Sequence, residues 1–93
     1  MEFDWDSRKD AVNRRKHGIS FSEAQQAFLD SNRIIAHDTK HGTEEEKRYF
    51  CFGKVGKRVM TVRFTVRENK IRIFGAGYWR EGRRRYEREN KIS

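Results

Sequence analysis

The chain has 93 residues, of which 34% are hydrophobic and 39% are charged, and its formal net charge is +8. This length fits a single domain over residues 1–93, because a domain usually takes about 100–200 residues. No run approaches the roughly 18 apolar residues of a membrane-spanning helix, and the acidic, alternating start is unlike a secretory signal. Cys51 is the one cysteine, which excludes an internal disulfide, and no Cys/His grouping has zinc spacing. We therefore expect a cytoplasmic protein without membrane association, metal or cofactor.

Positive charge is concentrated in the second half of the sequence. Residues 53–93 contain thirteen Lys or Arg and four Asp or Glu, a net charge of +9, whereas residues 1–30 have a net charge of −1. A one-sided positive field favours a polyanionic partner: RNA, DNA or an acidic protein. A basic surface that is merely solvated is the alternative.

The first third of the chain predicts a short strand followed by two helices. Apolar and acidic residues alternate over 1–6, which is typical of a half-buried strand. A polar helix is expected over 8–16 and ends before Gly18, because glycine tolerates the left-handed backbone found after a helix. Residues 20–23, Ser-Phe-Ser-Glu, have the spacing of a capping box and predict a second helix to about residue 30.

The rest of the chain predicts four strands and a terminal helix. The clearest strand alternates Met60, Val62, Phe64 and Val66 with Thr and Arg residues, and Glu-Asn-Lys at 68–70 predicts a hairpin turn after it. The expected strands cover residues 33–38, 48–55, 58–67 and 71–74, an exposed acidic loop covers 39–46, and a charged helix covers 80–90.

The order β-α-α-β-β-β-β-α predicts a small α+β domain with an antiparallel sheet, because short turns join the consecutive strands. Such a sheet packs its helices mainly on one face and leaves the other face wet. The open face would present hydroxyl and guanidinium groups, namely Thr61, Arg63, Thr65 and Arg67, with Arg72 on the neighbouring strand.

Several spaced motifs resemble the BrnT family of type II toxins, which are small ribonucleases with a RelE-like fold. The longest runs over residues 5–21 as Trp-Asp-x-x-Lys-x-x-x-Asn-x-x-Lys-His-Gly-Ile-Ser-Phe. Further matches are residues 58–64, Ile-Arg-Ile at 71–73, and Arg83-x-x-Tyr86-Glu87. The resemblance implies a toxin that cleaves RNA and is inhibited by a cognate antitoxin. It also implies that the antitoxin has a ribbon-helix-helix domain and that the complex reaches DNA only through it.

The last strand and helix depart from the family's pattern at two positions. Gly77 stands where the family commonly has Arg, and Gly82 stands where it commonly has Glu. Glu81 is one residue early, about 100° around a helix, whereas Arg83 matches. The departures keep open an alternative function, a non-catalytic nucleic-acid-binding or corepressor subunit of a toxin-antitoxin-like pair.

Metal-independent RNA cleavage needs cations around the phosphorane and groups that move two protons. The 2′-hydroxyl loses one proton and the leaving 5′-oxygen gains the other. Arginine suits a pair of phosphoryl oxygens, and an imidazole titrates near neutral pH. The candidate catalytic residues are Arg63, Arg83, His17 and Glu81. The candidate RNA-binding residues are Arg67, Arg72, Tyr78, Arg80, Arg84 and Arg85.

Structural roles compete with these assignments. His17, in the last helical turn before Gly18, is favoured as a cap for free carbonyl groups rather than as an acid or base. Trp79 is favoured as a core residue, although a base could also stack on it. Lys9, Asn13 and Lys16 share one helical stripe that either contacts RNA or the antitoxin or is simply solvated. Cys51 is expected to be buried in a strand.

Overall fold

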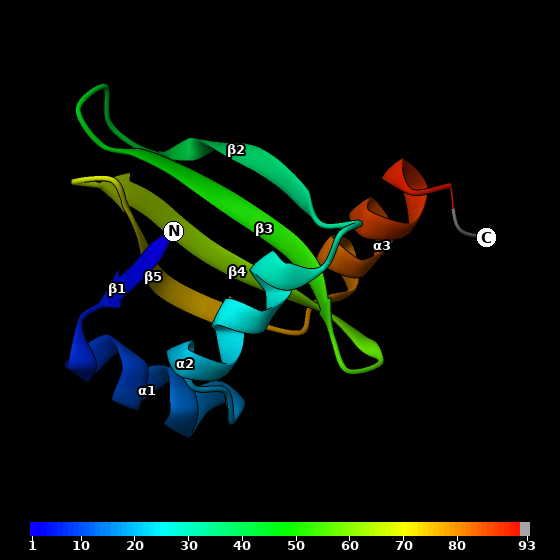
Figure 1. The fold of residues 1–93 in the computed structure, drawn as a ribbon, viewed down its shortest axis with the longest axis horizontal. Helices are drawn as coiled ribbons and strands as arrows, with labels where there is room; N and C mark the ends of the chain where they lie inside the picture. Colours follow the sequence, from blue (N-terminus) through cyan, green and yellow to red (C-terminus); the bar gives the residue numbers. More distant parts are fainter. Residues whose placement is uncertain (92–93) are drawn as a thin grey trace.

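A computed structural model describes residues 1–91 and shows a twisted sheet with helices on both of its faces (Figure 1). The elements are β1 (Glu2–Trp5), α1 (Ser7–His17), α2 (Phe21–Ala24), the 3₁₀ helix η1 (Gln25–Leu29), β2 (Ile34–Gly42), β3 (Lys47–Val55), β4 (Arg58–Arg67), β5 (Lys70–Gly77) and α3 (Arg80–Glu89). This order confirms the predicted α+β succession.

The sheet is mixed, so the prediction of a purely antiparallel sheet is wrong. Its five strands lie in the order β1-β5-β4-β3-β2. The pairs β2–β3, β3–β4 and β4–β5 are antiparallel, whereas β1 pairs parallel to β5 with Phe3 opposite Ile71. Tight turns join only the strands from β2 onward. A strand separated by helices from its partner is free to pair in parallel.

Three predicted elements have different lengths in the structure, and one of them is β5, which covers Lys70–Gly77 rather than residues 71–74. The second helix is a single α-helical turn, α2, continued by the five residues of η1 rather than a helix to residue 30. Strand β2 runs to Gly42 instead of residue 38, and its register against β3 shifts between Asp38 and Gly42. The acidic stretch expected as an exposed loop is therefore partly a continuation of the β2–β3 hairpin.

The predicted end of the first helix at Gly18 and the predicted start of the second helix at Ser20 are confirmed. Asp6 accepts hydrogen bonds from the backbone N–H groups of Arg8 (2.7 Å) and Lys9 (3.3 Å) at the start of α1. Gly18 has a left-handed backbone, φ 69°, and its N–H donates to a carbonyl of the last turn. The Ser20 hydroxyl accepts from the Glu23 N–H at 3.0 Å and begins α2.

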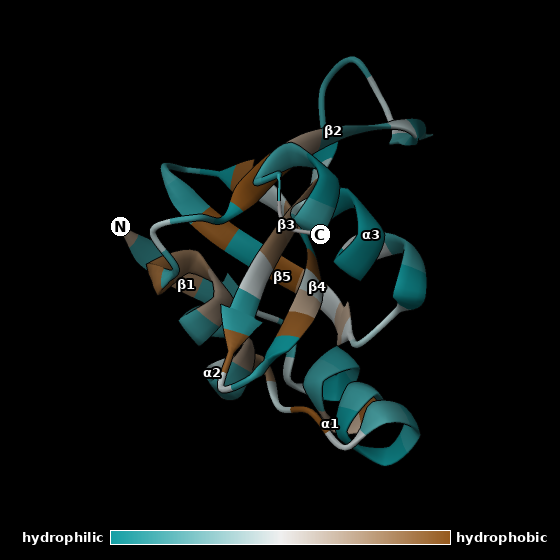
Figure 2. Ribbon diagram, turned by 90° about the vertical axis from the view of Figure 1, so that its right-hand side faces the viewer, coloured by the Kyte–Doolittle hydropathy of each residue, from teal (hydrophilic) through white to brown (hydrophobic). Residues whose placement is uncertain are grey.

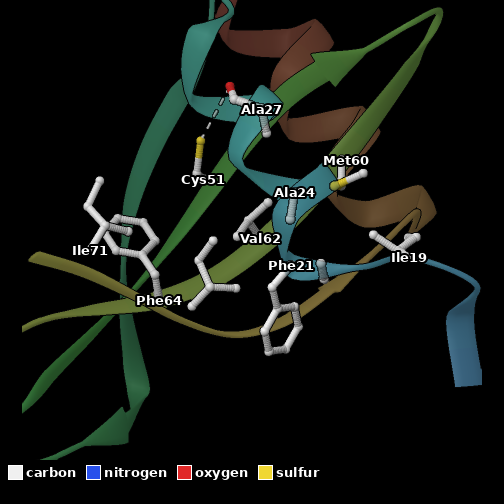
Figure 3. Close-up of a cluster of buried hydrophobic side chains, with 11 residues drawn as sticks. Ile19, Phe21, Ala24, Ala27, Cys51, Met60, Val62, Phe64 and Ile71 are labelled. Carbon is white, nitrogen blue, oxygen red and sulfur yellow. Dashed lines mark hydrogen bonds between the residues drawn. The ribbon is translucent and has the colours of Figure 1, made fainter. Parts of the chain in front are cut away.

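The main core lies between the sheet and the layer made of α1, α2 and η1 (Figure 3). Met60, Val62 and Phe64 project from β4 into it, as their alternation predicts. Phe21 and Ala24 from α2 close the other side, and neither has exposed surface. Helix α1 itself is largely hydrophilic, in contrast to the apolar segments of the strands (Figure 2).

Asn13 is the buried residue of α1, where the sequence analysis placed it on a basic stripe. Its side-chain amide donates to the Ile19 carbonyl at 2.9 Å, and its side-chain oxygen accepts from the Ala76 N–H at 3.2 Å. Asn13 therefore joins α1 to the loop after it and to β5. This fixes the helix although few of its residues are apolar.

Helix α3 covers one end of the opposite face, which was expected to be wet. Gly82 faces the sheet, where a Cβ atom would collide with the Thr61 hydroxyl and come within 3.0 Å of Phe52. Tyr86 is 1% exposed and completes a second cluster with Phe52 and Val59. Thr61 is consequently buried, at 5% exposure, and Thr65, further along β4, is buried at 2% exposure in the wall of a hollow outside the helix. In Figure 1, α3 lies at the end of the sheet away from the tips of the β2–β3 and β4–β5 hairpins.

Candidate nucleic-acid interface

The uncovered part of the α3 face carries a cluster of cations around one aromatic ring. The Arg48 guanidinium carbon lies 4.5 Å from the centre of the Phe74 ring, that of Arg63 lies 5.1 Å away, and the Lys9 Nζ atom lies 6.0 Å away. We call Lys9, Arg48, Arg63 and Phe74 the Phe74 patch. Its residues come from α1, β3, β4 and β5, so the fold assembles it from distant parts of the chain.

A β-bulge explains why Phe74 points to this face. Arg63 pairs with Gly75 and Phe64 pairs with Ile73, which leaves Phe74 as an extra residue in β5. Ile73 and Ala76 remain buried in the main core, whereas Phe74 is half-buried. Bulges re-aim side chains and often occur beside functional sites.

The arginines near the patch differ in whether a carboxylate neutralises them. Arg67 pairs with Glu46 at 2.7 Å, and Arg72 pairs with Asp4 at 2.6 Å. The hydrogen bond from Arg67 holds the pKa of Glu46 below its ordinary value. Within residues 1–91, Arg48 and Arg63 form no ion pair, and the Nε atom of Arg48 is buried without a hydrogen-bond partner. Among the arginines near the patch, Arg48 and Arg63 are therefore the two whose guanidinium groups are available to bind an anion.

A small hollow of about 140 Å³ adjoins the patch. Its polar walls are four cations, two carboxylates and one hydroxyl, from Lys9, Arg48, Arg67, Arg72, Asp6, Glu46 and Thr65. The Thr65 hydroxyl donates to the Lys47 carbonyl at 2.6 Å, so it is occupied in holding two strands together. The cations of this hollow outnumber its carboxylates, Asp6 and Glu46, which suits a phosphate group and its negative oxygens.

Helix α3 holds the other predicted arginines. Arg80, Arg83 and Arg84 are exposed, as is Glu81, whereas Arg85 is half-buried and pairs with Glu89. Thr61 lies under the helix, and Arg63 projects from the same face two residues further along β4. Two residues of strand span about 7 Å, so Arg63 lies beside the edge of α3.

One hydrogen-bond network fixes α3 to the rest of the domain. The Tyr86 hydroxyl donates to Asp30 Oδ2 at 2.7 Å, and the same oxygen accepts from the Lys54 N–H at 2.8 Å. Burial alone would raise the pKa of Asp30, but these hydrogen bonds outweigh it and lower that pKa. Burial, followed by the hydrogen bond to Asp30, raises the pKa of Tyr86 to about 12. This network sets where the helix lies against the sheet.

His17 and Tyr78 lie together in a second place, a hollow of about 540 Å³ beside the end of β5. The His17 ring meets the Trp79 ring edge-on, with centroids 5.4 Å apart, and the Arg58 guanidinium lies 3.8 Å from the Tyr78 ring centre. Trp79 is 40% exposed, so the expectation that it fills the core is wrong. The Gly18 N–H, rather than the His17 side chain, donates to a carbonyl of the last helical turn.

Sequence reasoning missed Arg48, Phe74 and Arg58 as candidate site residues. The one signal for Phe74 was the glycine after it, which is common where a strand bulges. Cys51 is buried as expected, and desolvation raises the pKa of its thiol to about 12. Within residues 1–91, no three His, Cys, Asp or Glu side chains gather as metal ligands, and no helix is long and apolar enough to cross a membrane.

Comparison with known proteins identifies the family. Residues 5–82 match the sequence model of a family described as ribonuclease toxin, BrnT, of type II toxin-antitoxin system. No curated protein matches the chain. The matched segment contains α1, the four strands β2 to β5 and the start of α3, and it includes every residue of the Phe74 patch. Since the match covers most of the sequence, the chain belongs to the BrnT family of type II toxin-antitoxin ribonuclease toxins.

Proposed function

We propose that this chain cleaves RNA without a metal ion, and that the Phe74 patch binds the phosphate at which cleavage occurs. The observation that carries the proposal is the pair Arg48 and Arg63, which point at one ring and have no carboxylate partner within residues 1–91. Family membership indicates the class of reaction, which is RNA cleavage. The two arginines indicate where the phosphate would bind.

The reaction requires no atom beyond the RNA itself. The 2′-oxygen bonds to phosphorus, the bond to the 5′-oxygen breaks, one proton leaves the 2′-hydroxyl and one reaches the 5′-oxygen. The charge on the phosphoryl oxygens grows as the 2′-oxygen attacks. Fixed guanidinium groups stabilise that charge. Positioning of the substrate and stabilisation of this charge can together supply most of the rate enhancement. His17 and Glu81 stay our candidates for the proton transfers, and Arg83 stays a candidate for a second phosphate contact.

A cleavage assay in EDTA tests this proposal. Arg63→Ala and Arg48→Ala should each lower the cleavage rate by about 10²–10³-fold, the effect of removing one preorganised donor. Arg15→Ala is the matched control, because Arg15 is exposed on α1 and has no ion-pair partner within residues 1–91. Cleavage that requires a divalent ion would contradict the metal independence. Full activity in both patch variants would contradict the site.

The cognate antitoxin is the proposed partner, with a ribbon-helix-helix domain that carries the complex to DNA. Expression of this chain alone should arrest growth, and co-expression of the neighbouring reading frame should relieve the arrest. Cells should tolerate expression of the double variant, with both Arg48→Ala and Arg63→Ala, in the absence of that reading frame. Arrest that persists in the double variant would contradict RNA cleavage at the patch.

Gly82 favours a second candidate function, a non-catalytic corepressor subunit. Any side chain at this position would push α3 off Thr61 and Phe52, so a carboxylate cannot be accommodated there with the helix in place. If the chain lacks catalysis for that reason, it should cause no growth arrest. The complex of this chain with the antitoxin should then bind the promoter of the two genes more tightly than the antitoxin alone does.

A further inference from the structure

The hollow beside Trp79 has the size of a small-ligand site, and its lining combines two aromatic rings with charged side chains. Its volume of about 540 Å³ lies within the usual range of about 300–1,000 Å³ for such sites. We call it the Trp79 hollow, and its walls include Lys16, His17, Glu23, Arg58, Tyr78 and Trp79. We propose that this hollow binds a base of the RNA, and that it prefers guanine. The inference rests on the proposed function, because it assigns the nucleotide next to the bound phosphate.

Trp79 supplies a stacking surface that the rest of the protein holds in place. Its ring lies directly over Gly77, where a Cβ atom would collide with the indole. The His17 ring contacts it edge-on, at an interplanar angle of 77°. The indole is thus supported from two sides, yet 40% of the residue remains exposed. An exposed aromatic ring in a basic setting is the platform on which single-stranded bases stack.

Arg58 and Glu23 supply polar groups of opposite sign to the same hollow. The Arg58 guanidinium is held 3.8 Å from the Tyr78 ring centre, so the ring orients it. Within residues 1–91, neither Arg58 nor Glu23 forms an ion pair, with the other or with any third residue. Burial and then the charge of Glu23 raise the pKa of Tyr78, while Arg58 opposes them, so both charges act at this ring.

Guanine is the base that matches this pair of groups. It presents two adjacent donors, N1–H and the N2 amino group, to which a carboxylate can bind. It also presents O6 and N7, which are the preferred acceptors of an arginine. Adenine and cytosine place a bare ring nitrogen beside their amino group, and this nitrogen would face the carboxylate. Uracil offers one donor. Stacking on Trp79 would accept any base, so the preference should come from Glu23 and Arg58.

The Trp79 hollow lies next to the Phe74 patch along β5. The Arg63 side chain covers Gly75, and the Trp79 ring covers Gly77. Residues two apart in a strand lie on one face, about 7 Å from each other. A phosphate held by Arg63 would therefore have its neighbouring base within reach of Trp79. The two glycines leave room for both side chains to lie flat on the strand.

Fluorescence titration with short uncleavable RNA tests this inference. The probes are fluorescein-labelled 2′-O-methyl tetranucleotides of sequence UUGU, UUAU, UUCU and UUUU, titrated in EDTA, and the anisotropy of the label reports binding independently of Trp79. The protein carries Trp5→Phe, which removes the other indole and leaves Trp79 as the reporter. The guanine probe should bind at least about tenfold more tightly than the other three, as expected for one bidentate contact. It should also quench Trp79.

Matched variants locate the preference. Glu23→Gln should abolish the preference for guanine and leave the affinity for UUUU unchanged. Its control, Glu45→Gln, changes an exposed carboxylate outside the hollow and should keep the preference. Trp79→Ala has no indole left, so its binding is followed by the anisotropy of the labelled probes; it should weaken all four, and circular dichroism should show an unchanged fold. Glu23→Gln keeps the backbone N–H that Ser20 caps, so this variant should fold. The test therefore does not depend on whether the Trp79 variant folds.

The outcomes separate this inference from the proposed function. Equal affinity for the four probes, or a guanine preference that survives Glu23→Gln, would overturn the guanine site. Salt-sensitive binding without Trp79 quenching would overturn the base site while leaving the phosphate surface intact. Guanine-dependent quenching in a protein that never cleaves RNA would uphold the base site and refute the nuclease. Absence of binding by any probe would overturn both.

Discussion

The two faces of the sheet are built from the same strands, but their side chains are used differently. On the face toward α1 and α2, alternate residues of β4 such as Met60 and Val62 are fully buried in an apolar core. On the face toward α3, the residues between them are Thr61, Arg63 and Thr65, and α3 covers only part of them. Stability is thus concentrated on one face and uncompensated charge on the other. Substitutions on the two faces should separate folding from RNA binding.

The largest expected effect is on the α1–α2 face. Phe21→Ala removes a ring with no exposed surface that packs edge-on against Trp5. It should lower the free energy of unfolding by about 3–5 kcal/mol, the usual cost of emptying such a site. Phe74→Ala, the matched change on the other face, should cost about 1 kcal/mol. Urea denaturation measures both, and equal losses would remove the distinction between the faces.

Tyr86→Phe tests the hydrogen bond that fixes α3. Loss of the hydroxyl leaves Asp30 without one of its donors and should cost about 1.5–3 kcal/mol, because the acceptor is charged. Thermal unfolding at neutral pH measures the change. An unchanged midpoint would mean that apolar packing alone holds α3.

The same bond gives stability a dependence on pH at both extremes. The folded protein lowers the pKa of Asp30 below 3.8, so its contribution is complete above about pH 4 and is lost as the pH falls through the lowered pKa. The folded protein raises the pKa of Tyr86 from 10.0 to about 12, so its contribution is complete below pH 10 and is lost as the pH rises toward 12. Cys51, with a pKa raised from 9.0 to about 12, adds to the alkaline loss. Tyr86→Phe should therefore weaken, but not remove, the alkaline decline in unfolding temperature.

Gly82→Ala should have a smaller effect on the free energy of unfolding, because two contributions of opposite sign act at this position. Alanine favours helices by about 1 kcal/mol over glycine, but the added methyl group would strike Thr61 and crowd Phe52. Overpacking of this kind costs about 1–3 kcal/mol, so we expect net destabilisation. A stabilised variant in urea denaturation would show that α3 has room to move away from the sheet.

The sequence predicted what depends on local pattern. The alternation in β4, the Ser20 cap and the left-handed Gly18 each follow from neighbouring residues, and the structure confirms them. The parallel pairing of β1 depends on a contact between β1 and β5, which lie far apart in the sequence, and no local pattern reports it. The positions of Arg48 and Phe74 depend on register and on a bulge, so their meeting could not be read from spacing. The face of the sheet on which Arg63 lies could be predicted because Arg63 belongs to a regular strand.

The salt dependence of RNA binding tests the central assignment most directly. Each phosphate contact on a single strand contributes about −0.7 to the slope of log affinity against log salt. Arg48 and Arg63 are assigned to one phosphate, so replacing both by Ala should make the slope shallower by about 0.7. The unfolding free energy should change by less than about 0.5 kcal/mol, as for other surface changes. A double variant that keeps the wild-type slope and affinity would contradict the assignment of the Phe74 patch as the surface that grips RNA.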